Sequence, residues 1–128
     1  MSSALDFAAQ EHSGGQWLPP PYRVPVNATS PKLANSIIAH SGVCRLFGFT
    51  ATSTNVAAQF ILLFDANAVP SAGAVPLATF NVALAASVGG YWGSMGRWFD
   101  RGIVLCNSTT QGTLTIGAAD TIFDVQYV

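Results

Sequence analysis

The chain has 128 residues and a formal net charge of −1, with 50% hydrophobic residues and only 9% Asp, Glu, Lys or Arg. One domain of this length buries enough surface to fold without a metal ion or a disulfide. Its five cations are scattered, which argues against nucleic-acid and membrane partners, since both draw affinity from clustered positive charge; they are Arg23, Lys32, Arg45, Arg97 and Arg101.

Residues 1–33 are predicted to form an extended, proline-rich N-terminal arm. The first residues lack the basic and apolar regions of a signal peptide, and no apolar run is long enough for a transmembrane helix, so assembly in a cytoplasm is expected. Three consecutive prolines at 19–21 remove backbone donors and fit poorly inside a sheet. Large side chains beside them make the arm a candidate interface with its own domain or a neighbour: Trp17, Leu18 and Tyr22.

Residues 34–128 are predicted to form a β-sandwich domain. Short β-branched and aromatic runs are separated by Gly, Asn, Ser and Pro, which is typical of strands and turns. About eight such runs favour an all-β, antiparallel sandwich or barrel. The predicted strands cover residues 35–40, 43–51, 57–65, 75–84, 90–98, 102–108, 112–116 and 120–127. The pair Ser30-Pro31 also fits the start of a helix, so residues 31–40 are either strand or helix.

Two of these runs have the clearest face patterns. Residues 121–127 alternate, so that Phe123 and Val125 share a face opposite Asp124, which is predicted to face solvent. Residues 59–65 are apolar on both faces. This pattern predicts a central strand that is covered on both sides.

The residues that most often bind metals are too few and too dispersed for a zinc site. His12 and His40 are the only histidines, and Cys44 and Cys106 form no paired motif. A structural zinc site needs about four such ligands at local spacing. No cofactor is expected, and both cysteines are predicted to stay reduced and to serve as small core hydrophobes.

Catalytic patterns are also missing. The segment Gly93-Ser94-Met95-Gly96 lacks the spacing of a nucleophile elbow, which is Gly-x-Ser-x-Gly. Asp100 and Asp120 lie in predicted turns, and Asp124 is on the solvent face of its strand, so no carboxylate pair is indicated. The chain is therefore not expected to be an enzyme.

The aromatic cluster Tyr91, Trp92, Trp98 and Phe99 is the strongest hint of binding. Sugar-binding modules stack rings on exposed aromatic side chains, whose apolar faces suit carbohydrate. However, Trp92 and Trp98 are an even number of residues apart on the strand predicted at 90–98, so both would face the core or an interface. That interpretation is favoured, and Tyr91 and Trp92 are candidate interface residues.

The carboxy-terminal two thirds of the chain, roughly residues 42–128, resemble small virion proteins of tailed bacteriophages. The order of the matching segments is distinctive, although no single segment is diagnostic. The matching segments are 59–70, 73–76, 96–109, 115–120 and 123–128. The resemblance implies a jelly-roll-like β-sandwich displayed on a phage particle.

These expectations agree with the low charge content, which suggests that other subunits cover part of the surface. A capsid decoration (cement) protein needs a rigid sandwich and a contact surface poor in charge, but no active site. The resemblance implies binding to the major capsid protein and to copies of itself as a homotrimer, on the capsid surface of a virion assembled in the bacterial cytoplasm. The alternative is a receptor- or carbohydrate-binding module of a tail fibre.

Overall fold

The computed structural model describes residues 24–55, 57–83 and 86–128, and every regular element in them is a strand. The predicted arm residues Trp17, Leu18 and Tyr22 lie outside the described residues. The nine strands are β1 (Val26–Thr29), β2 (Ser36–Ser41), β3 (Cys44–Ser53), β4 (Gln59–Asp65), β5 (Ala78–Val82), β6 (Ser87–Tyr91), β7 (Arg97–Phe99), β8 (Gly102–Ser108) and β9 (Thr121–Tyr127).

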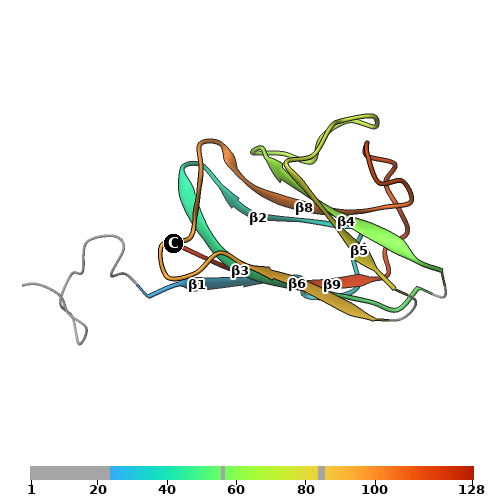
Figure 1. Cartoon of the computed structure of the whole chain (residues 1–128), viewed down its shortest axis with the longest axis horizontal. Helices are drawn as coiled ribbons and strands as arrows, with labels where there is room; N and C mark the ends of the chain where they lie inside the picture. Colours follow the sequence, from blue (N-terminus) through green and yellow to red (C-terminus); the bar gives the residue numbers. More distant parts are fainter. Residues whose placement is uncertain (1–23, 56, 84–85) are drawn as a thin grey trace, which may run out of the picture.

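The strands form two antiparallel sheets that pack face to face (Figure 1). One sheet has the order β1-β9-β3-β6, with the short β7 also paired to β3, and the other has the order β2-β8-β4-β5. The strand pairs β1–β9, β2–β8, β3–β6 and β4–β5 are nested along the chain, as in a long hairpin that is rolled up. This nesting is the topology of a jelly roll. The predicted all-β, jelly-roll-like sandwich is confirmed.

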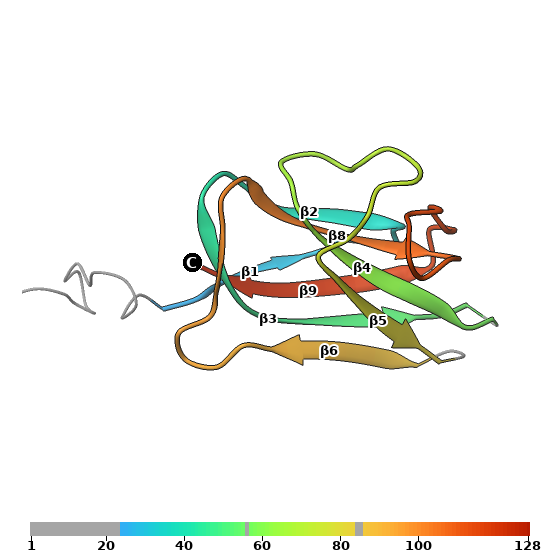
Figure 2. The same cartoon turned by 45° about the horizontal axis from the view of Figure 1, so that its top comes forward.

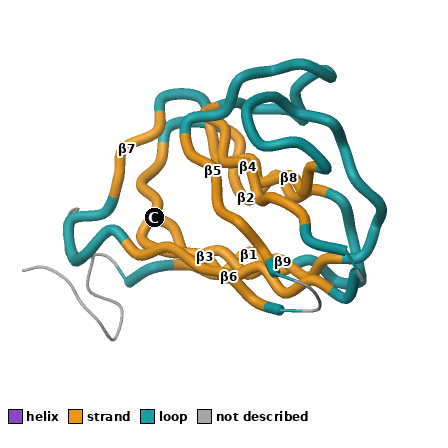
Figure 3. Tube along the Cα trace, turned by 45° about the vertical axis from the view of Figure 1, so that its right-hand side comes forward, coloured by secondary structure: helices purple, strands orange, loops and turns teal. Residues whose placement is uncertain are grey.

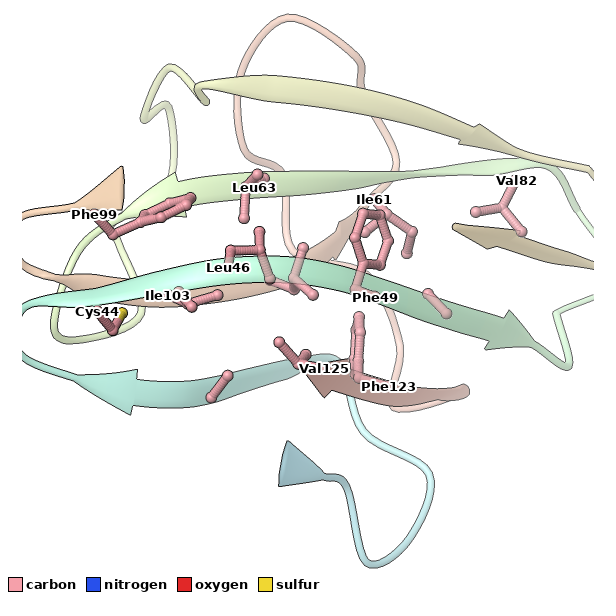
Figure 4. Packing of buried hydrophobic residues seen from close by; sticks show 13 residues of the cluster. Cys44, Leu46, Phe49, Ile61, Leu63, Val82, Phe99, Ile103, Phe123 and Val125 are labelled. Atoms are coloured by element: carbon pink, nitrogen blue, oxygen red, sulfur yellow. The ribbon is translucent and has the colours of Figure 1, made fainter. Parts of the chain in front are cut away.

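The main core lies between the two sheets and follows the alternation of the strands. In β9, Phe123 and Val125 are fully buried, whereas Asp124 between them is only half-buried. Figure 4 shows both side chains pointing into the space that Leu46 and Ile61 also fill from other strands. The face pattern predicted for residues 121–127 is therefore confirmed, and burial of these apolar side chains is what holds the sheets together.

A second, smaller core covers the other side of the four-stranded sheet. Leu62 and Phe64 of β4 point away from the main core and pack with Leu114. Two loops cover this face, residues 66–77 and 109–120, and they hydrogen-bond to each other through Leu114. The loop after β4 rises beyond the sheet in Figure 1. The prediction that residues 59–65 form a central strand covered on both sides is thus confirmed.

The structure places β1 inside the range predicted as arm. Val26–Thr29 pairs with β9, so the sandwich begins before residue 34. Pro25 and Pro31 flank the strand instead of interrupting it, and β1 is at the edge of its sheet, where proline next to a strand is tolerated. Prolines at this spacing are incompatible with a central strand but compatible with a short edge strand.

Two other predicted strands and the helix alternative need correction. Residues 90–98 do not form one strand but two, β6 and β7, separated by a loop at 92–96. Residues 112–116 form a loop with one isolated bridge, between Ser108 and Ile116. Of the two alternatives for residues 31–40, strand is correct, because β2 pairs with β8 from Ser36 onward.

Candidate functional site

The two cysteines are the first side chains to consider as nucleophiles or metal ligands, and both are buried. Cys44 and Cys106 are buried free thiols, as predicted for small core hydrophobes. Burial raises the pKa of Cys106 to about 12, and burial together with the charge of Asp65 raises that of Cys44 to about 11. Neither is a thiolate nucleophile at neutral pH. Within residues 24–55, 57–83 and 86–128, no group of three His, Cys, Asp or Glu side chains could hold a metal ion.

Asp120, predicted as a simple turn residue, instead joins a polar cluster at one end of the sandwich. Its Oδ1 accepts hydrogen bonds from Gln59 Nε2 at 3.1 Å, Asn107 Nδ2 at 2.9 Å and Thr121 Oγ1 at 3.0 Å. Its Oδ2 accepts one from Asn55 Nδ2 at 2.5 Å. Burial raises the pKa of Asp120, but the bonds from Gln59, Asn55 and Thr121 outweigh it and lower the pKa below 3.8. With its acceptors occupied, this carboxylate fixes loops and offers no general base.

Tyr91 is the most exposed aromatic side chain described, at 78%. It ends β6 opposite Gly48 of β3. A Cβ built on Gly48 would lie 3.7 Å from Tyr91 Cδ1 and 3.5 Å from Gln126 Oε1. Tyr91, Gly48 and Gln126 therefore share the outer side of the five-stranded sheet.

Trp98 is also at the surface, 57% exposed, on the outer side of β7. Its neighbour in the chain, Phe99, is fully buried in the core, so Trp98 points the opposite way. Its Nε1 donates to Asp100 Oδ1 at 2.9 Å, and the guanidinium of Arg45, its cross-strand partner, lies 5.9 Å from the ring centroid. These contacts hold the indole in one orientation.

Trp92 differs from both. It is half-buried and packs against the main core, with its ring centroid 6.1 Å from that of Phe49 and 6.3 Å from that of Phe80. The expectation that both tryptophans lie on one side is therefore wrong: Trp92 packs against the core, whereas Trp98 lies at the surface. They do not share a face because the predicted strand 90–98 is broken between them.

The two strands and the loop between them carry three exposed large side chains, which we call the β6–β7 patch: Tyr91, Met95 and Trp98. Met95 is 62% exposed in the loop that joins the two strands. Gly93 and Gly96 take the positive φ values of 74° and 70° that this turn requires. Figure 3 shows β7 near the chain's C-terminus. Two glycines three residues apart are the sequence signal for this turn, so the strand predicted at 90–98 should be divided there.

Beside the patch, the outer side of the five-stranded sheet forms a surface that we call the outer face. Nine of its ten residues are uncharged, and six of these have polar side chains, some of which bond to one another, such as Thr52 Oγ1 and Ser87 Oγ at 2.8 Å. Asp124 is its one carboxylate among the described residues, and it accepts from Thr29 Oγ1 at 2.9 Å. The outer face consists of Asn27, Thr29, Gly48, Thr50, Thr52, Ser87, Gly89, Ile122, Asp124 and Gln126.

The β6–β7 patch and the outer face therefore adjoin on the outer side of the five-stranded sheet. In the part of the chain that the structure describes, no helix is long and apolar enough to cross a membrane. Comparison with known proteins finds no family model, curated protein or solved structure that matches this chain.

Proposed function

We propose that this chain is a non-enzymatic structural subunit of a bacteriophage particle, a capsid decoration protein that binds the major capsid protein and copies of itself. It would act at the capsid surface of the virion, as a homotrimer assembled in the bacterial cytoplasm. The resemblance of residues 42–128 to small phage virion proteins supplies the class of particle. The outer face and the β6–β7 patch supply surfaces for the two kinds of contact.

The observation that carries this proposal is the nearly uncharged outer face. In a monomer, a strand with one exposed face normally alternates core residues with charged and polar residues. The charged residues keep the exposed face solvated. Here Thr50, Thr52 and Ser87 are exposed on three adjoining positions without a charge among them. Loops cover β4 and β8 on the outer side of the other sheet, whereas Thr50, Thr52 and Ser87 stay exposed among the described residues and offer a β surface to a partner. Hydroxyl and amide side chains lose little on desolvation if a partner satisfies their hydrogen bonds.

Adding charge to the outer face tests the proposal. We expect Thr50→Lys combined with Thr52→Lys to weaken self-association or attachment to the phage particle at least about tenfold, because burying an unpaired ammonium is costly. The matched control is Thr109→Lys combined with Gln111→Lys, which adds the same charge on an exposed loop. Light scattering measures the mass, expected near 40 kDa for three chains of 13.4 kDa, and pelleting with particles measures attachment.

The result that would contradict the proposal is equal mass and equal attachment for the outer-face variant, the control and the unmodified chain. Circular dichroism of both variants shows whether each keeps its β-sheet spectrum, so that a folding defect is recognised. A density map of the intact phage particle would locate the protein. Density for this fold on the head supports the decoration role, and its absence from the particle contradicts that role.

Exposed Tyr91 and Trp98 favour a second candidate, a carbohydrate-binding module of a tail fibre. Both side chains are more than half exposed, and Trp98 has a carboxylate beside it, at Asp100, that could accept from sugar hydroxyls. If this is the function, Tyr91→Ala should reduce glycan affinity at least about tenfold on a host-surface polysaccharide, whereas Val75→Ala, at an equally exposed site, should not. Absence of measurable glycan binding by the unmodified chain contradicts it.

A further inference from the structure

We infer that the β6–β7 patch is the docking site for the proline-rich segment 17–22 of a second copy of this chain. The inference rests on the proposed self-association and names the contact that would produce it. It is drawn from the spacing of the two rings, from the composition of the segment, and from where the described chain begins.

The two rings have a defined spacing along β3. Tyr91 is opposite Gly48 and Trp98 is opposite Arg45, so their anchor points are three residues apart on one strand. A register shift between Leu46 and Gly48 keeps both positions on the outer side despite the odd spacing. Because the shift places an extra residue of β3 opposite β9, the anchor points are between two and three residue spacings apart, about 7 to 10 Å along the strand at about 3.3 Å per residue.

This spacing matches one turn of a polyproline II helix. Three consecutive prolines favour that conformation, which rises about 3.1 Å per residue and about 9 Å per turn of three residues. Residues three apart then lie on the same side, so Pro19 and Tyr22, or Leu18 and Pro21, can each meet both rings at once. Aromatic-lined surfaces are a recurrent binding site for such segments, because the preformed helix loses little entropy on docking.

The chemistry of the two partners is also complementary. Residues 17–22 carry no charge, and their prolines provide carbonyl acceptors without N–H donors. The patch offers apolar ring surface and the phenol hydroxyl of Tyr91, which can donate to such a carbonyl. The indole of Trp98 is held in place by Asp100 and Arg45, so docking on it orders few new side-chain rotations.

The geometry favours a second copy over the chain's own arm. Val26, Tyr127, Leu46 and Arg97 lie in one row across the sheet, so the described chain begins three strand spacings, about 14 Å, from β7. Figure 2 shows β1 and β6 on opposite sides of β9 and β3. A path from Val26 to the patch crosses β9 and β3, whereas the two rings are aligned along β3. A neighbouring copy can approach along that direction.

Such a contact is head to tail, because each copy gives a segment and receives one at a different site. Contacts of this kind close into rings when the rotation between copies allows it. A trimer whose three patches are each filled by a neighbour's segment is one such ring, so the inferred contact agrees with the proposed oligomer.

Two full-length variants test the inference by complementation. The donor variant carries Pro19→Ala, Pro20→Ala and Pro21→Ala, and the receptor variant carries Tyr91→Ala and Trp98→Ala. Each removes one half of the contact, so each alone is expected to self-associate at least about tenfold more weakly than the unmodified chain. Mixing them restores one intact contact, between the receptor variant's segment and the donor variant's patch, and should give pairs near 27 kDa, twice the 13.4 kDa chain.

The control is Val75→Ala, which trims an exposed apolar side chain far from β6 and β7 in the sequence and should not alter the mass. The inference is overturned if either variant associates like the unmodified chain, if the mixture forms no pairs, or if all forms are monomers. If the donor and receptor variants still form oligomers but the outer-face lysine variant does not, the proposed function is still supported and only the inferred contact is wrong. Loss of glycan binding in the receptor variant without any change in mass would instead support the carbohydrate-binding candidate and overturn the inference.

Discussion

Replacing Phe123 with alanine is expected to lower the free energy of unfolding by about 3–5 kcal/mol, the usual range for removing a large ring from a core. Phe123 is fully buried between the two sheets, opposite Ala51 of β3. Ala51 is too small to fill the space that the ring would leave, so part of the cavity is expected to stay open. Urea unfolding at 25 °C, followed by circular dichroism, measures the change.

Ile122 provides the matched control for this prediction. It is the preceding residue on the same strand, but it lies on the outer face and is only half-buried. Ile122→Ala should cost about 1 kcal/mol or less, because little apolar surface returns to water. Similar losses for the two variants would mean that β9 does not face the core in the observed register.

Acid is expected to destabilise the protein through Asp120 and Asp65. At Asp65, burial raises the pKa, but the backbone N–H groups of Arg101, Asp100 and Gly102 outweigh it and lower the pKa below 3.8. The pKa of Asp120 is also lowered, by hydrogen bonds that outweigh its burial. A carboxyl whose folded pKa lies below its unfolded value stabilises the fold above about pH 4, and this contribution disappears as the pH falls through the folded pKa. We therefore expect these groups to leave stability constant from pH 7 to 5 and to reduce it below pH 4.

Asp120→Asn should lower the free energy of unfolding by about 2 kcal/mol at pH 7, because an amide keeps only one of the two acceptor oxygens. With that oxygen toward Gln59 and Asn107, the new NH2 group faces the donor of Asn55, and the hydrogen bonds lose the carboxylate charge. The difference from the unmodified protein should shrink as the pH falls through the folded pKa of Asp120, because the native carboxyl is then protonated too. Asp100→Asn is the control: it removes the same charge at an exposed site and retains an acceptor for Trp98. Urea titrations at pH 7, 5, 4 and 3 measure all three proteins, and a difference that widens in acid would contradict the assignment.

The stability predictions and the assembly predictions concern different parts of the molecule. Phe123, Asp120 and Asp65 maintain the sandwich and its end loops, whereas Thr50, Thr52 and the β6–β7 patch lie on its outside. Variants on the outside should therefore change oligomer mass or particle attachment with little change in unfolding. This separation makes it possible to tell a lost interface from a lost fold.

The sequence by itself determined the features that depend on local alternation of side chains. The pattern of residues 121–127 gave the buried face of β9, and the apolar run at 59–65 gave a strand covered on both sides, because a strand has only two faces and each side chain reports one of them. The small number of charges and the absence of a catalytic pattern likewise follow from composition and spacing alone.

Only the tertiary structure decided which segments pair and where strands stop. β1 exists because the edge of β9 accepts four residues between two prolines, and β6 and β7 are separate because Gly93 and Gly96 allow a turn that both strands can make beside β3. That turn sends Trp92 inward and Trp98 outward, and the jelly-roll pairing brings Asp120 to Asn55, Gln59 and Asn107. Such contacts join residues distant in sequence, so their energy depends on a partner that no local pattern identifies.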